Sequence, residues 1–251
     1  KTSKQGKFQI VDVVEMMKPL SKYTKQITHG AHIPSIIREA FRTAQEERPG
    51  TVHIELPEDI AREEIENPFI FDVVPSRMPS ADTTAIHDAV AMISTAKKPL
   101  LLIGAGENRK RACHALTHFV ETLGIPFFNP QMGKGIIDER HPLYLGTAAL
   151  SDYDFIHEAI DSADLIINVG HDTIEKPPFF MHPDDKRKVI HINFFAAEID
   201  DVYFPQLNVI GDIASSISEL TNQLKSKAKQ WNIDSFLEVK KNVNLHLKKY
   251  V

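Results

Sequence analysis

A short glycine motif carries the clearest chemical signal in the sequence. Gly104 and Gly106 follow the apolar run Pro99–Ile103, and cationic residues 109–111 open the helix expected next. Backbone N–H groups and a helix dipole in this context can cradle a phosphate. The third glycine of the dinucleotide fingerprint is missing, and Asn129 stands where an acidic residue would contact a ribose. A nucleotide-like ligand and a tight turn with solvated charges both stay open as interpretations.

Three further patterns contain chemically active side chains. Residues 132–135 place two glycines in a turn after an expected strand, which suits either a flexible loop or a close backbone approach to a ligand. Residues 170–172 end another expected strand with a histidine and an aspartate that face either a ligand or water. His114 and His118 have the spacing of a shared metal, but no carboxylate lies between them. We therefore predict no metal site and interpret this pair as packed or solvated.

Composition argues against several classes of function. The 251 residues have a net charge of −5, which predicts no nucleic-acid partner. No window approaches the roughly 20 apolar residues that span a bilayer, and the start lacks the apolar part of a signal peptide. We therefore expect a cytoplasmic protein without membrane contact. The single cysteine, Cys113, fits a reducing compartment. Phosphate-loop, Gly-x-Ser-x-Gly and His-Glu-x-x-His motifs are absent, so a self-contained hydrolase is not expected.

Alternating apolar runs and amphipathic stretches must position these residues. Continuous apolar runs of about 4–6 residues are typical of strands in a parallel sheet covered on both faces. The sequence therefore predicts a doubly wound α/β domain, whose ligands would bind after strand ends Ile103, Val169 and Ile192. The expected strands are 100–103, 126–129, 165–169, 189–192 and 207–210, and the expected helices are 81–96, 109–123, 152–163 and 213–224.

The first part of the chain is too small for a domain of its own. Residues 1–59 contain one expected helix, opened by Ile33 and Pro34, and one expected strand, 52–56. One helix and one strand cannot bury a core, so this part belongs to a larger α/β domain. Residues 60–80 lack periodicity and are rich in proline and acids, as a linker is.

The second domain covers residues 81–224. Ser80 is the expected N-cap of its first helix, and Asp212 that of its last. The Lys- and Asn-rich residues 225–251 are interpreted as a linker toward a further domain, with the apolar anchors Trp231, Phe236 and Leu237.

Several short motifs stand in order along the chain. The first part contains Phe8-Gln9-Ile10-Val11-Asp12, Lys18-Pro19-Leu20-Ser21-Lys22 and residues 48–59, which begin Arg48-Pro49-Gly50. The second part contains Lys98-Pro99, Gly104-x-Gly106, Gly124-Ile125-Pro126, Met132-Gly133-x-Gly135, His141-Pro142-x-x-x-Gly146, Ala163-Asp164-Leu165, His191-Ile192-Asn193 and Gly211-Asp212. The first set resembles the end of the pyrimidine-binding domain of acetolactate synthase large subunits, and the second resembles the central domain of that thiamine-diphosphate enzyme family. Their colinear order from Phe8 to Leu224 supports the resemblance.

The resemblance implies a transferase of branched-chain amino acid biosynthesis. Such an enzyme decarboxylates pyruvate on thiamine diphosphate, held with Mg²⁺, and joins the two-carbon unit to a second 2-oxo acid. Phe8 and Gln9 match a pair beside the cofactor at a subunit interface, and are the implied catalytic residues. The family's catalytic glutamate would precede residue 1, and its Gly-Asp-Gly metal motif would follow the tail in a diphosphate-binding domain. A homodimer or tetramer, and a regulatory subunit, are the implied partners.

FAD is a further candidate cofactor, because the central domain of biosynthetic members holds one. The positions that match FAD contacts are Arg48, Gly104, Gly106, Met132, Gly133, Gly146, Gly170 and Asp212. The family's FAD-type pattern has Arg-Phe-Asp-Asp-Arg after Gly170, but residues 171–178 differ from it and look more like the flavin-independent, catabolic members. Asn193 also replaces an acidic residue expected after a strand. These departures favour the flavin-independent type, with FAD as the alternative.

Two rival functions stay open from the sequence. One is a non-catalytic nucleotide-binding or oligomerisation module that keeps the fold without the chemistry. The other is a different thiamine-diphosphate decarboxylase or carboligase, because such enzymes share the central domain.

Overall fold

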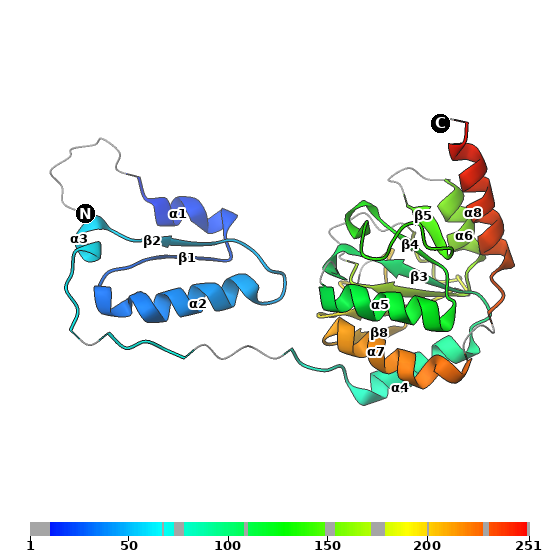
Figure 1. Ribbon diagram of the computed structural model, residues 1–251, viewed down its shortest axis with the longest axis horizontal. Helices are drawn as coiled ribbons and strands as arrows, with labels where there is room; N and C mark the ends of the chain where they lie inside the picture. Colours follow the sequence, from blue (N-terminus) through cyan, green and yellow to red (C-terminus); the bar gives the residue numbers. More distant parts are fainter. Residues whose placement is uncertain are drawn as a thin grey trace. The chain divides into compact units, whose positions relative to one another are not determined.

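The chain divides into two units, Lys1–Arg77 and Met78–Val251 (Figure 1). The structure is a computed structural model that describes residues 11–66, 68–72, 78–107, 110–148, 154–171, 179–199, 201–227 and 231–249. Within these ranges, no helix has both the length and the apolar character needed to cross a membrane.

The first unit is built on two parallel strands, β1 (Tyr23–Gln26) and β2 (Val52–Glu55). Helices α1 (Val13–Met17) and α2 (Ile33–Gln45) contact both strands, and the short helix α3 (Glu58–Ala61) follows β2. The predicted helix and strand are confirmed as α2 and β2, whereas the polar strand β1 has no apolar pattern that would predict it. The buried hydrophobic residues in the described part of this unit are Ile27, Ile36 and Ala40, a very small core.

The second unit contains a parallel sheet of six strands in the order β5-β4-β3-β6-β7-β8. The chain runs outward from β3 to β5, returns to the centre at β6, and runs outward the other way. This order confirms the doubly wound prediction and places the reversal of strand order between β3 and β6. The strands are β3 (Pro99–Ile103), β4 (Phe127–Asn129), β5 (Tyr144–Thr147), β6 (Leu165–Val169), β7 (Lys188–Asn193) and β8 (Leu207–Ile210).

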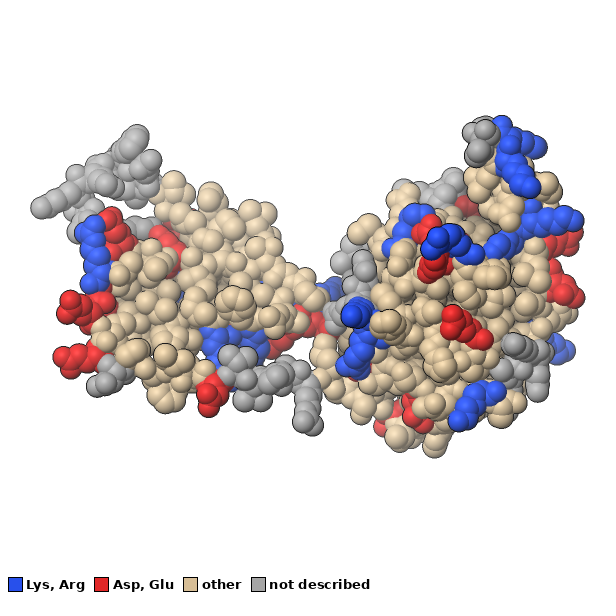
Figure 2. Space-filling model, in the orientation of Figure 1, with Lys and Arg blue, Asp and Glu red and all other residues tan. Residues whose placement is uncertain are grey.

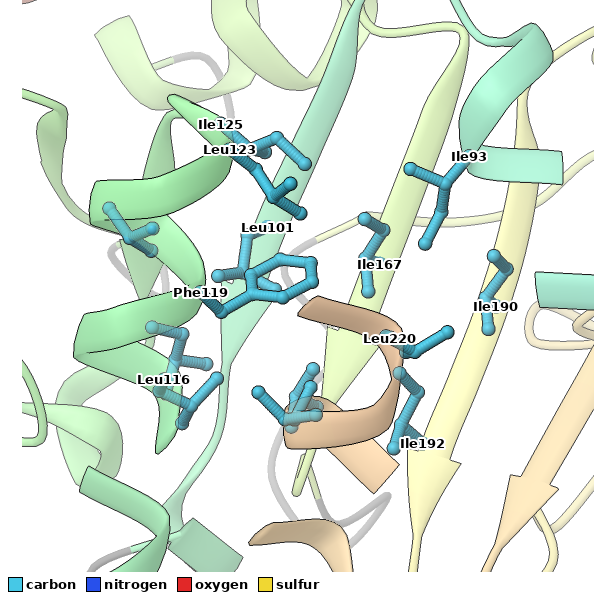
Figure 3. Close-up of a cluster of buried hydrophobic side chains, with 14 of the residues drawn as sticks. Ile93, Leu101, Leu116, Phe119, Leu123, Ile125, Ile167, Ile190, Ile192 and Leu220 are labelled. Atoms are coloured by element: carbon cyan, nitrogen blue, oxygen red, sulfur yellow. The ribbon is translucent and has the colours of Figure 1, made fainter. Parts of the chain in front are cut away.

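Helices cover both faces of this sheet (Figure 1). One layer holds α4 (Thr83–Thr95), α5 (Lys110–Leu123) and α7 (Ile213–Leu224), and the other holds α6 (Phe155–Ser162) and α8 (Asp234–Leu247). Every residue of β3 and β6 is buried, as strands covered on both faces require. Figure 3 shows part of the larger core, in which Phe119 of α5 and Leu220 of α7 pack with Ile167 of β6.

Asp residues cap three helices of this unit, α4, α6 and α7. The predicted cap Ser80 is wrong, because Asp82 accepts hydrogen bonds from the backbone N–H groups of Thr84 (2.8 Å) and Ala85 (3.2 Å) and starts α4 two residues later than expected. The predicted cap Asp212 is confirmed, since its side chain accepts from Ser215 N at 2.8 Å. Helix α6 begins after its cap Asp154, because that carboxylate accepts from two backbone N–H groups of the first turn.

The tail contains a packed helix, where the sequence indicated a linker. Phe236 and Val239 of α8 are buried against the sheet, and the Trp231 indole N–H donates to Leu123 O at 2.9 Å. Leu237, expected to be an anchor, is exposed. The three-residue spacing of Phe236 and Val239 is helical, but the abundance of Lys and Asn obscures it.

Candidate ligand site at the centre of the sheet

The reversal point between β3 and β6 brings four of the predicted glycines together. A Cβ atom added to Gly104 would lie 2.2 Å from the Cα of His171, and one added to Gly106 would lie 2.8 Å from the carbonyl oxygen of Gly170. A Cβ atom on Gly133 would lie 2.2 Å from Ile103 O. Side chains at these positions would therefore force the loops after β3, β4 and β6 apart. We refer to Gly104, Gly106, Gly133 and Gly170 as the glycine seam.

The N–H groups of the seam are hydrogen bonded within the protein. Gly104 N donates to Val169 O at 2.8 Å, and Gly106 N donates to Gly170 O at 2.9 Å. Gly170 N in turn donates to Ile192 O at 3.0 Å. A phosphate cradle needs N–H groups that point at the ligand, and these three point at carbonyl oxygens. The predicted glycines are thus neighbours, but in this arrangement they allow the loops to pack closely and do not present N–H groups to a ligand.

Asn193, at the end of β7, ties the strand ends together. Its Nδ2 donates to His171 O at 3.2 Å, and its Oδ1 accepts from Phe194 N at 2.8 Å. Asn193 and His171 are both buried. The Asn193 amide, at a position where an acidic residue was expected, therefore stabilises the loops at this edge. His171 faces the protein interior rather than water.

Figure 2 shows Lys and Arg interspersed with Asp and Glu on the visible face of the second unit, and one ion pair lies at the start of α5. The Arg111 guanidinium, at the start of α5, pairs with the Asp212 carboxylate and donates to Ser215 Oγ at 3.0 Å. Asp212 also caps α7, so its carboxylate accepts hydrogen bonds from both the Arg111 guanidinium and the backbone N–H of Ser215. The neighbouring Lys110 is exposed. The pair links the starts of α5 and α7, which lie at the same carboxyl edge of the sheet.

A buried asparagine holds the loop that carries Met132 and Gly133. Asn129 Nδ2 donates to Gly133 O at 3.3 Å, while its Oδ1 accepts from the hydroxyls of Tyr144 and Thr147, each at 3.1 Å. Burial raises the pKa of Tyr144, so its hydroxyl stays a donor. Sequence reasoning saw Asn129 only as a missing acid. A polar residue at the end of an apolar strand was the available signal for this network.

Lys134 extends the same network outward. Its ammonium donates to Glu139 Oε2 at 3.0 Å and to Thr147 Oγ1 at 3.3 Å. The hydrogen bond that its ammonium donates to Glu139 raises the pKa of Lys134. Met132 lies in the sequence between Asn129 and Lys134, which are both anchored by hydrogen bonds, and is 65% exposed. The loop therefore presents an apolar side chain to the outside from a backbone that is fixed on both sides.

The remaining predicted residues belong to β5, to the first unit, or to the part of the chain outside the described residues. Gly146 lies in β5 with φ of +144°, where a side chain would be strained and would meet Ile156. Arg48 belongs to the first unit, exposed and at φ of +41°, at the stop after α2. Phe8 and Gln9, the implied catalytic residues, lie outside the described residues, as do positions 109 and 172–178.

The donor set fits neither a bound pyrophosphate nor a metal ion. The seam glycines, Asn193, Arg111 and Asp212 are engaged with protein atoms, which leaves no cradle for FAD in the part of the edge that the structure describes. His114 and His118 are exposed along an open groove between α5 and α7. In the described residues, no three His, Cys, Asp or Glu side chains are grouped to hold a metal, Mg²⁺ included.

Comparison with known proteins identifies the fold family. The family model for the thiamine pyrophosphate enzyme central domain matches residues 86–220. Among curated relatives, a probable acetolactate synthase large subunit from Methanococcus aeolicus is 32% identical over 86% of this chain and 37% of its own length. An acetolactate synthase from Bacillus subtilis is 28% identical over 84% and 37%, and a glyoxylate carboligase from Escherichia coli is 27% identical over 85% and 36%.

A solved structure agrees on the fold. An X-ray structure described as a thiamin diphosphate-dependent enzyme from Mycobacterium smegmatis superposes with a TM-score of 0.68, at 22% identity over 84% of this chain and 41% of that one. The chain thus spans well under half the length of the relatives it matches. The family model covers more than half of the chain, and the strand order is that of a doubly wound domain. The chain therefore belongs to the thiamine pyrophosphate enzyme family, whose central domain it contains.

Proposed function

We propose that this chain is the central part of a thiamine-diphosphate-dependent carboligase of the acetolactate synthase type. Its reaction would decarboxylate pyruvate and transfer the two-carbon unit to a second 2-oxo acid. The observation that supports this proposal is the alignment with acetolactate synthases of several organisms over 84–94% of the chain. Thiamine diphosphate supplies the carbanion chemistry in such enzymes when it is bound.

The described residues act in this proposal as a scaffold. The buried β3 and β6 and the glycine seam fix the carboxyl edge of the sheet, and the Asn129 network fixes the loop with Met132. Thiamine diphosphate and Mg²⁺ would be bound elsewhere in the enzyme, because the sequence lacks a Gly-Asp-Gly motif. We propose a flavin-independent enzyme, because the seam donors already have protein acceptors.

Phe8 and Gln9 are the proposed contribution of this chain to the active centre. The basis is their match to the family pair beside the cofactor, at an interface between subunits. A homodimer or tetramer is therefore part of the proposal, and a regulatory subunit is a further proposed partner. Gln9→Ala should lower product formation without altering the fold. Gln45→Ala, at the end of α2, is the matched control.

The test is product analysis with the protein as cells make it. Its intact mass is first compared with the 28.3 kDa of these residues. The protein is then incubated with pyruvate, thiamine diphosphate and Mg²⁺, and acetolactate is measured by mass spectrometry. Acetolactate that disappears when thiamine diphosphate is omitted supports the proposal. If the intact mass of the protein is well above 28.3 kDa and the pyruvate in the incubation is not consumed, the acetolactate assignment is refuted.

Glyoxylate is the second substrate to test, because a glyoxylate carboligase is 27% identical over 85% of the chain. The same incubation with glyoxylate in place of pyruvate separates the two activities. If glyoxylate is consumed in its incubation and pyruvate is not consumed in the other, the protein would be a glyoxylate carboligase instead.

A further inference from the structure

A mainly apolar hollow of about 500 Å³ opens on the surface of the second unit. The last turn of α5 lines one side with Val120 and Glu121. The other two sides come from the turn before β5 and from the segment before α8, which supply Pro142, Leu143, Trp231 and Ile233. We call this cavity the Trp231 hollow. Its size and its apolar, partly aromatic lining are those of sites for small organic molecules.

The Trp231 hollow lies at the amino-terminal edge of the sheet. Helix α5 ends at Leu123, immediately before the chain enters β4, and residues 141–143 lead directly into β5. Asn232 N donates to Lys97 O at 2.9 Å, just before the start of β3. The glycine seam is at the opposite, carboxyl edge, where ligands of doubly wound sheets bind. A molecule in the hollow would therefore not compete with one at the seam.

Hydrogen bonds hold the walls of the hollow in place. The Trp231 indole N–H donates to Leu123 O at 2.9 Å. The Lys240 ammonium, from α8, donates to His141 O at 2.9 Å and to Pro142 O at 2.7 Å. Because these bonds already fix the walls, a ligand would have little ordering entropy to overcome.

Glu121 gives the hollow a negative group, while the Lys240 ammonium in its wall is already bound by the carbonyl oxygens of His141 and Pro142. Glu121 is the one carboxylate among its described lining residues. The last turn of α5 is fully described and contains no Lys, Arg or His. No side chain of that turn therefore neutralises the negative end of the helix dipole. The His141 ring is held in the wall by the hydrogen bond that its Nδ1 accepts from Leu143 N at 3.1 Å.

We propose that the Trp231 hollow binds a small apolar amine in its ammonium form. The hydrocarbon part packs against Trp231, Leu143 and Val120, and the ammonium group lies at Glu121 beside the end of α5. This site goes beyond the carboligase proposal and does not depend on it. An amine-bearing metabolite bound there would act at a distance from the carboxyl edge.

Trp231 provides a direct test, because it is the single tryptophan of the chain. Its fluorescence and its indole N–H resonance are followed while the chain is titrated with cyclohexylmethylamine, cyclohexylmethanol or cyclohexanecarboxylate. These probes share one ring and differ in charge. We expect saturable binding of the amine, about tenfold weaker binding of the alcohol, and weaker binding still of the carboxylate.

Glu121→Gln removes the charge from an exposed side chain and should bring the amine to the level of the alcohol. Glu219→Gln, on α7 and away from the hollow, is the matched control and should leave the tenfold preference intact. Equal binding of the three probes, no saturable change in either Trp231 signal, or an unaltered preference in Glu121→Gln would each overturn the proposal. Far-UV circular dichroism of both variants checks that they fold.

Discussion

Removal of one buried hydroxyl should measurably destabilise the second unit. Tyr203 lies in the segment between β7 and β8, and its hydroxyl accepts from Asn168 Nδ2 at 2.5 Å and lies 3.0 Å from His191 Nδ1. His191 Nε2 is 3.3 Å from Phe195 O. If Nε2 donates to that carbonyl, the Tyr203 hydroxyl donates to Nδ1, and one chain of hydrogen bonds connects β6 and β7 to the segment. Asn168, His191 and Tyr203 are each at most 2% exposed.

Tyr203→Phe keeps the ring and deletes both hydrogen bonds. Each of the two buried partners that loses a hydrogen bond costs about 1–2 kcal/mol, whereas the ring still fills its space, so we expect a loss of about 2–4 kcal/mol in the free energy of unfolding. For a unit of this size, about 3 °C of Tm corresponds to each kcal/mol, which gives a fall of roughly 6–12 °C. Burial raises the pKa of Tyr203, so the hydroxyl stays protonated and the effect should persist at alkaline pH.

Differential scanning calorimetry of three Tyr→Phe variants measures the effect. Tyr144→Phe should cost about 1 kcal/mol, because Asn129 Oδ1 keeps the Thr147 hydroxyl as a donor. Tyr23→Phe removes an exposed hydroxyl 3.2 Å from Glu39 Oε2, and should change stability by no more than about 0.5 kcal/mol. A Tyr203→Phe variant as stable as Tyr23→Phe would refute the reasoning, because burial would then not set the cost of these bonds.

Three further predictions concern the seam, a helix cap and the flavin. Gly104→Ala should lower the free energy of unfolding by about 3 kcal/mol or more in urea melts, because its Cβ would lie 2.2 Å from the Cα of His171. Gly50→Ala should be tolerated, because the nearest atom to its Cβ would be in the flexible Lys22 side chain, at 3.0 Å. Hydrogen bonds from the backbone N–H groups of Ala85 and Thr84 lower the pKa of Asp82. The Asp82 carboxylate therefore contributes its full stability above the unfolded-state pKa of about 3.9, and this stability is lost as pH falls through the lower pKa of the folded state. Acid titrations should therefore fall less steeply in Asp82→Asn, whose amide caps without titrating, and equal slopes would contradict this account. After incubation with FAD and removal of the unbound flavin by gel filtration, the protein should show no visible flavin absorbance, and a stoichiometric flavin spectrum would show that the seam opens.

The sheet was predictable because its strands are short, apolar and continuous. Burial on both faces leaves few residue types that fit β3 or β6, so composition alone marks them. Strand β5 has no such pattern, since Tyr144 and Thr147 direct hydroxyls to Asn129 and Gly146 sits at positive φ. Strand β1 is polar for another reason, because the described part of its unit buries little. Side-chain hydrogen bonds to Asn129 hold β5, and backbone pairing with β2 holds β1, and the local sequence encodes neither.

The glycine pattern indicated a tight local structure but not its chemistry. The Gly-x-Gly turn after β3 lies at the reversal point of the sheet, where only glycine allows the loops to approach so closely. The same spacing cannot say whether the neighbour is a phosphate or another peptide, since both need the missing Cβ. Here the neighbours are His171 and Gly170. The N–H groups of Gly104 and Gly106 donate to the carbonyl oxygens of Val169 and Gly170, and Asn193 Nδ2 donates to His171 O. Glycine spacing therefore indicates a close approach, and the acceptor opposite each N–H group, which the sequence does not show, determines what approaches.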